Sequence, residues 1–163
     1  MNKKQQYTSI ITILLVIILL LGISFWHLNV GVMRNLTYNL RDIQYRLDGM
    51  EDVLASDSLS KTEQDEKIKT LSRDAFVAIQ NVNAIAEESI LYRGYQMSNA
   101  ETFFLDLVVD PEQVNNSRIK EKLLDMSQLL KFNLETERGH DYNLIVDKNH
   151  IKKIIASSEE RLK

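Results

Sequence analysis

The first residues that could do chemistry lie near the C-terminus, where His140, Asp147 and His150 are close together in sequence. Imidazole and carboxylate groups are common zinc ligands, and Asp147 and His150 are three apart, which places them on one face of a helix. Their spacing does not match a recognised metal motif such as HExxH. Because histidines in a polar segment more commonly face solvent, we predict no metal site and no cofactor.

Acid–base catalysis has a second set of candidates in Glu87, Glu88 and Glu101, with Arg93 nearby. Such catalysis requires environments that drive two pKa values apart, whereas these residues fall on predicted helix faces where charges are solvated or paired. The chain has no cysteine, which excludes a thiol nucleophile, a thiolate zinc site and a disulfide. It also has no Gly-x-Ser-x-Gly elbow and no glycine-rich phosphate loop. We therefore predict no catalytic residue and expect that the protein is not an enzyme.

A binding patch is the first interpretation of the segment around Arg93, which lies between Tyr92 and Tyr95. Arginine flanked by tyrosines is typical of binding surfaces and would suit a small anionic ligand. The alternative is a helix end at which the two tyrosines cover the tip of a hairpin.

The segment "ETFFLDLVV", residues 101–109, is unusually apolar for its length and contains Phe103 and Phe104. It either fills the end of a helical bundle or docks a partner, and core filling is the favoured interpretation.

The C-terminal residues 148–163 hold five Lys or Arg and two Glu, although the whole chain has a net charge of −3. A basic amphipathic helix can lie on anionic lipid or on an acidic partner, and the alternative is a solvated terminal helix. The acidic balance of the chain predicts no nucleic-acid partner.

A membrane must be considered for residues 7–26, "YTSIITILLVIILLLGISFW", which contain no charged side chain. As a helix this segment spans about 30 Å, the thickness of the hydrocarbon core of a bilayer. Tyr7 and Trp26 lie at its two ends, where aromatic rings favour the headgroups, and Ile10 and Leu20 lie within it. We predict a transmembrane anchor after a short tail, residues 1–6. A cleaved export signal ending near Ser24 and a buried helix of a soluble fold are the alternatives.

The orientation follows from Lys3 and Lys4, which precede the apolar segment directly. Under the positive-inside rule they place the N-terminus in the cytoplasm and the remainder of the chain outside it. We therefore expect a single-pass signal-anchor protein of the cell envelope, with the lipid bilayer as one partner.

A heptad pattern follows the predicted anchor, within a long helical hairpin expected over residues 27–97. Apolar residues recur at alternating spacings of four and three, which is the seam of a coiled coil. The seam consists of Leu36, Leu40, Ile43, Leu47, Met50 and Leu54. It predicts either association with a second chain or packing against a later helix of the same chain.

Capping signals divide the remaining sequence. Ser60–Glu63 reads as a capping box that opens a helix extending to about Met97, and Ser98–Glu101 repeats the signature. Asp110 and Pro111 end the short helix that follows.

The C-terminal part of the predicted bundle, residues 98–163, continues with an amphipathic helix over 117–138. A last helix follows, capped by Asp147 or Asn149. Between them, Tyr142–Val146 has the composition of a short strand, but no partner strand is evident. The predicted fold class is mainly α.

These features predict an envelope scaffold or complex subunit that acts through protein–protein interaction, with another envelope protein or with itself. The contact would use the Leu36–Leu54 seam or the Phe103–Phe104 segment. In layout the chain resembles small bitopic proteins with membrane-proximal coils, such as phage inner-membrane spanins and small division-complex subunits. The alternative is an extracytoplasmic ligand-sensing bundle, similar to the sensory modules of chemoreceptors, with its ligand near Arg93. A sensor of this kind would need a partner, since the sequence contains no second apolar run of spanning length.

Overall fold

The computed structural model describes residues 3–135 and 147–162, with side chains described for residues 10–134 and 147–162. The described residues form five α-helices and one short 3-10 helix, and none of them lies in a strand. The prediction of a mainly α fold is confirmed. The predicted strand at Tyr142–Val146 and the candidate ligand His140 lie outside the described residues. The chain divides into two compact units, Met1–Val32 and Met33–Lys163.

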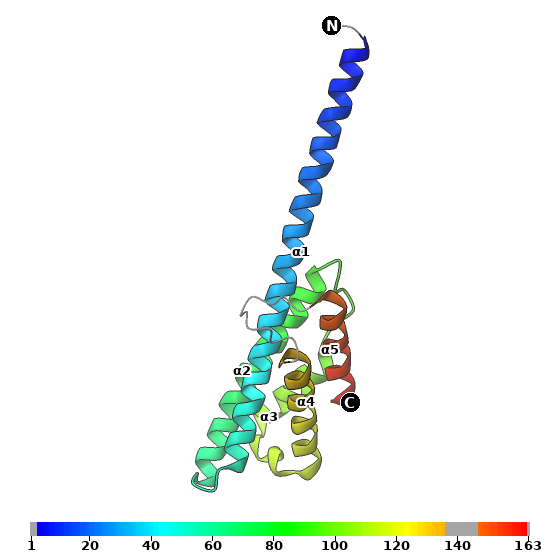
Figure 1. The fold of residues 1–163 in the computed structure, drawn as a ribbon. Coiled ribbons are helices and arrows are strands. Elements are labelled where there is room, and N and C mark those ends of the chain that lie inside the picture. Colours follow the sequence, from blue (N-terminus) through cyan, green and yellow to red (C-terminus); the bar gives the residue numbers. More distant parts are fainter. Residues whose placement is uncertain (1–2, 136–146, 163) are drawn as a thin grey trace. The chain divides into compact units, whose positions relative to one another are not determined.

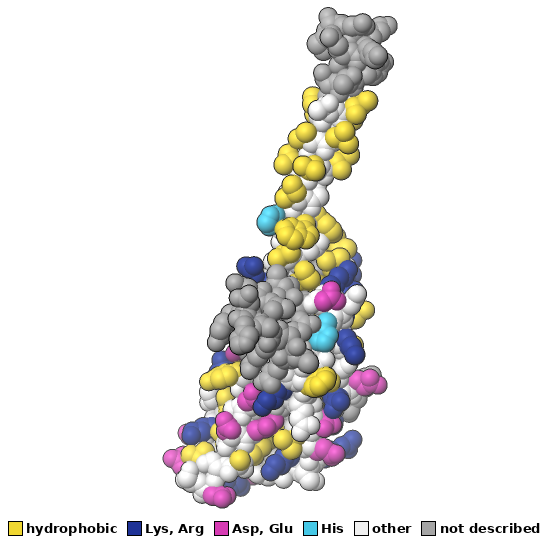
Figure 2. All heavy atoms as spheres, in the orientation of Figure 1, with side chains coloured by type: hydrophobic (Ala, Val, Ile, Leu, Met, Phe, Trp, Pro, Cys, Tyr) yellow, Lys and Arg dark blue, Asp and Glu magenta, His cyan; other side chains and the backbone are white. Residues whose placement is uncertain are grey.

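Unit 1 consists of the N-terminal part of helix α1, which as a whole runs from Lys3 to Ala55. Its most apolar stretch has a mean hydropathy of 2.6, and none of that stretch is buried. Figure 2 shows hydrophobic side chains along this part of the helix, whereas charged side chains are scattered among other side chains on the described face of unit 2 in view. By length and composition α1 can cross a membrane, although signal sequences and buried core helices satisfy the same criterion.

Unit 2 contains the remainder of α1 and five further elements (Figure 1). These are α2 (Lys61–Glu88), α3 (Ser98–Val109), the 3-10 helix η1 (Pro111–Asn115), α4 (Ser117–Glu135) and α5 (Lys148–Arg161). Helix α3 packs against α2, and α5 packs against α4 and α3.

Two contacts fix how α1 and α2 run past each other within unit 2. Arg46 of α1 forms an ion pair of 3.2 Å with Asp74 of α2. Further along α1, a Cβ added at Gly49 would lie 3.2 Å from Leu71 Cδ2, so glycine allows close approach there. Because residue numbers rise in α1 as they fall in α2, the two helices run in opposite directions.

The capping box at the start of α2 is confirmed. The Ser60 hydroxyl accepts a hydrogen bond from the Glu63 amide, and the Glu63 carboxylate accepts one from the Ser60 amide. Hydrogen bonds from the Ser60 side chain and backbone lower the pKa of Glu63, because they stabilise its charged form. Local sequence alone determines this helix start.

The prediction that this helix continues to about Met97 is wrong. Helix α2 ends at Glu88, and residues 89–97 form a turn in which Gly94 has φ +87°. That backbone conformation strongly favours glycine, so the helix cannot continue through this position with its regular geometry. The side chain of Asn83 closes the turn, since its Oδ1 accepts the Met97 amide at 2.6 Å.

The start of α3 also differs from its prediction. Met97, not Ser98, is the residue before the helix, and it provides no side-chain cap. Glu101 does not fold back onto its own helix start but accepts hydrogen bonds from Gln80 and Asn83 of α2, at 3.2 and 2.7 Å. The local pattern assigned the Glu101 carboxylate to a capping box. Because α3 packs on α2, this carboxylate forms its hydrogen bonds with α2 instead.

Three other helix boundaries agree with the sequence. Helix α3 ends at Val109, directly before Asp110 and Pro111, and Asp147 caps α5 by accepting the Asn149 amide at 3.0 Å. Helix α4 begins at Ser117 as expected, where Asn116 accepts the Arg118 amide.

Candidate functional site

The predicted seam lies in the core of unit 2. Leu36, Leu40 and Ile43 have no exposed surface, Leu47 and Met50 are 1% exposed, and Leu54 is half-buried. At the seam's C-terminal end, α4 is a neighbour, because Ser127 Oγ donates a hydrogen bond to Asp48 of α1 at 3.2 Å. The burial of these residues is therefore accounted for within one chain.

Phe103 and Phe104 also lie in the core, with Phe104 fully buried and Phe103 nearly so. Their rings make an edge-to-face contact at 5.4 Å, a favourable geometry for an aromatic pair. The two phenylalanines therefore present little surface for a partner, although Leu105 and Val109 of the same segment are exposed.

The structure separates the three residues of the predicted ligand patch. Tyr92 is fully buried, Tyr95 is half-buried, and the side chain of Arg93 is exposed. The cation beside the tyrosines comes from α5, because Lys152 Nζ lies 4.6 Å from the Tyr95 ring centroid and 5.8 Å from that of Tyr92. These contacts are cation–π interactions that hold α5 to the 89–97 turn.

The hydroxyl of Tyr92 is buried and has no hydrogen-bond partner among the residues that the structure describes. Burial, together with the negative charge of Asp147, raises the pKa of Tyr92 to about 12. Both effects disfavour the phenolate. An unpaired buried hydroxyl costs free energy that a phenylalanine would not.

A long-range cap joins α5 to α3. Both carboxylate oxygens of Glu159 accept the Asn99 amide at 2.8 Å, and one also accepts the Ala100 amide at 3.4 Å. The Asn99 side chain donates in turn to the Glu159 carbonyl at 3.2 Å. These amides belong to the unsatisfied first turn of α3, where negative charge is favourable.

The described part of the basic segment, residues 148–162, is docked on its own unit. Its apolar residues Ile151, Ile154 and Ile155 are buried, and Arg161 pairs with Asp125 of α4 at 3.4 Å. A membrane-bound amphipathic helix would need that apolar face for lipid, but here the protein covers it. The other candidate ligands serve structural contacts, since Asp147 caps α5 and His150 Nε2 lies 3.1 Å from the Asn133 carbonyl.

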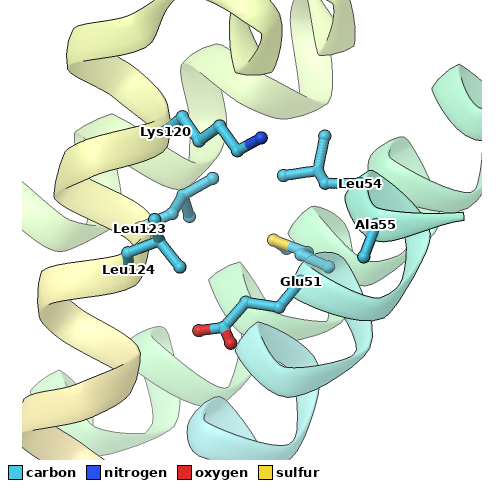
Figure 3. Close-up of a pocket in the computed structure, with 7 residues that line it drawn as sticks. Glu51, Leu54, Ala55, Lys120, Leu123 and Leu124 are labelled. Atoms are coloured by element: carbon cyan, nitrogen blue, oxygen red, sulfur yellow. The ribbon is translucent and has the colours of Figure 1, made fainter.

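A cavity of about 220 Å³ lies between the C-terminal end of α1 and the start of α4. Figure 3 shows Lys120, Leu123 and Leu124 facing Glu51, Leu54 and Ala55 across it, and Met50 also lines it. Glu51 Oε1 is buried, and no described residue forms a hydrogen bond with it. A carboxylate oxygen in this state can bind a cationic group, which would compensate for its lost hydration.

Sequence analysis missed this cavity and the Glu159 cap. Neither has a local signature, because each depends on residues far apart in sequence. The only local signal was the presence of Met50 and Leu54 on the predicted seam.

Comparisons of the chain with protein-family models, with curated proteins and with solved structures find no match.

Tyr92→Phe tests the buried hydroxyl. At pH 7 the variant should be more stable than wild type by about 1 kcal/mol, because an unpaired polar group is removed. As the pH rises from 10 through about 12, the unfolded tyrosine releases its proton before the folded one does. The wild type should therefore lose on the order of 2 kcal/mol more than Tyr92→Phe over this range.

The measurement is urea unfolding at a series of pH values. Tyr45→Phe is the matched control, since the Tyr45 side chain is 69% exposed, and it should follow the wild type. Equal losses in the wild type and Tyr92→Phe above pH 10 would contradict the assignment.

Proposed function

We propose that this is a single-pass membrane protein whose helical unit 2 binds another membrane or envelope protein, or a second copy of the chain. The observation that carries the proposal is the exposure of the apolar side chains between Ile10 and Trp26. The large apolar side chains of this stretch are 46 to 64% exposed. Apolar surface on all sides of a helix is costly in water and favourable in lipid, at about 25 cal/mol per Å².

Anchoring defines the proposed mechanism. Attachment to the bilayer confines unit 2 to a thin layer and raises its effective concentration toward other membrane components. Lys3 and Lys4 favour an N-terminus in the cytoplasm, with unit 2 on the opposite side of the membrane.

The seam has a specific place in this proposal. We propose that α1 and α2 form an antiparallel hairpin with coiled-coil-like packing, with the seam inside it. A partner would then contact side chains that remain on the surface of α1. Tyr38 and Tyr45 are 51 and 69% exposed, and their spacing of seven residues places them on one face. Tyrosine is enriched in protein interfaces.

A topology experiment tests the anchor. The full chain carries a tag after Lys163, protease is added outside intact cells, and the mass of the protein is measured. We expect loss of the tag together with a full-length mass. Protection of the tag would overturn the orientation, and a mass lacking the apolar segment would identify a cleaved signal and overturn the anchor.

Crosslinking tests the contact surface. Because the chain has no cysteine, Tyr45→Cys and Leu47→Cys each carry one attachment site for a photoactivatable maleimide. In native membranes we expect the exposed position 45 to be labelled and to form an adduct, which mass spectrometry identifies. Position 47, with 1% exposure, should remain unlabelled. Adducts from position 47 and none from position 45 would show that the seam itself is intermolecular.

A second candidate function is favoured by the unpaired Glu51 oxygen. We propose that, as a sensor, the protein uses the cavity lined by Glu51 and Lys120 to bind a small amine with an apolar group. Its volume of about 220 Å³ lies below the range usual for drug-sized ligands, which start at about 300 Å³. The apolar group would contact Leu123 and Leu124, and the ammonium would pair with Glu51.

Thermal unfolding of the full chain with butylamine or leucine tests this site. Tenfold excess over the dissociation constant should add about 1.4 kcal/mol of stability and raise the Tm. Glu51→Gln, which keeps the shape but removes the charge, should lose this rise, and Arg93→Ala should keep it. The reverse result would place the ligand at Arg93, and no rise with either compound would contradict this cavity as an amine site.

A further inference from the structure

We propose that the turn formed by residues 89–97 inserts into the membrane interface, with Ile90 as the side chain that enters the lipid. This inference rests on the proposed function, because it requires the bilayer anchor. It adds a second lipid contact, made by unit 2 itself.

The first observation that supports insertion of the turn is the exposure of Ile90. It is 85% exposed, more than any other large apolar side chain among those described. An isoleucine with this exposure buries little of its apolar surface within the fold. Burial of this side chain in lipid would be favourable, because it removes apolar surface from water.

The backbone of the turn is also suited to a medium of low polarity. The amides of Tyr92 and Arg93 both donate to the Ser89 carbonyl, at 3.3 and 3.0 Å, and Tyr95 donates to the Tyr92 carbonyl at 2.9 Å. The Leu91 amide donates to Ser89 Oγ at 3.2 Å. Since these donors are satisfied within the turn, its approach to lipid leaves none of them unpaired.

The third observation that supports insertion is the position of the turn within unit 2. Helices α1 and α2 run in opposite directions, as the Arg46–Asp74 ion pair and the Gly49–Leu71 contact establish. The end of α2 at Glu88 therefore lies toward Met33, where α1 enters unit 2. Only six residues, 27–32, separate Trp26 from Met33 in the sequence, so this end of unit 2 is the one joined to the apolar segment.

Side chains around the turn match the chemistry of an interface. The half-buried Tyr95 carries a ring of the type that favours the headgroup level, and the exposed Arg93 can extend its charge toward water and phosphate. The cations Arg93 and Lys152 are offset by the exposed acids Glu87 and Glu88. We therefore expect apolar insertion that does not depend on anionic lipid.

The chain provides clean reporters for this contact, because it has no cysteine and only one tryptophan, Trp26. Arg93→Cys, labelled with an environment-sensitive fluorophore, retains Ile90, and the full-length protein is reconstituted in phosphatidylcholine vesicles. Brominated phosphatidylcholine should quench the label at position 93. Adding Ile90→Asp, a change at an exposed position, should abolish that quenching.

A matched control comes from Val109→Cys, labelled in the same way. Val109 is 76% exposed and ends α3, and the nearby Glu112 pairs with Lys61 at the start of α2. The 28 residues of α2, about 42 Å of helix, separate that end from the turn. The label at position 109 should remain unquenched.

Trp26 separates failure of this inference from failure of the anchor. Quenching of Trp26 without quenching at position 93 would overturn the inserted turn and leave the anchor intact. A Trp26 that is not quenched would overturn both. Quenching at position 93 that persists with Ile90→Asp, or that appears only when phosphatidylglycerol is added, would overturn apolar insertion through Ile90.

Discussion

The organisation of unit 2 depends on the need to bury one apolar stripe, the Leu36–Met50 part of the α1 seam. Helices α2 and α4 both contact α1 along this stretch, through the Arg46–Asp74 ion pair and the Ser127–Asp48 hydrogen bond. Helix α3 then packs on α2, and α5 packs on α4 and α3. A stripe with almost no exposed surface thus explains why the remaining helices gather where they do.

Local patterns predicted much of this fold, and the errors have a common physical cause. The Ser60 capping box, the stop before Pro111 and the Asp147 cap each depend on residues only a few positions apart. The end of α2 was predicted too late because the helical spacing of apolar residues continues through Tyr92. Gly94, which has a positive φ, is the residue in this segment that indicates a turn.

The site was less predictable than the fold, since its geometry is built from distant residues. The sequence placed Arg93 between two tyrosines, but the cation that contacts their rings is Lys152. Glu101 has the residue type expected in a capping box, but its carboxylate accepts a hydrogen bond from Asn83 because α3 packs on α2. The sequence did not distinguish whether the seam packs against a second chain or against a later helix of the same chain. The fold shows that one chain buries nearly all of the seam's surface.

The Glu159 cap has a consequence for the order in which the structure assembles. The first-turn amides of α3 receive their carboxylate from a residue 60 positions later in the chain. During synthesis, α3 therefore leaves the ribosome before its cap exists, and it gains these hydrogen bonds only after Glu159 has also emerged. Completion of the α2–α3 surface, and of the turn between them, is thus a late event in the biogenesis of the protein.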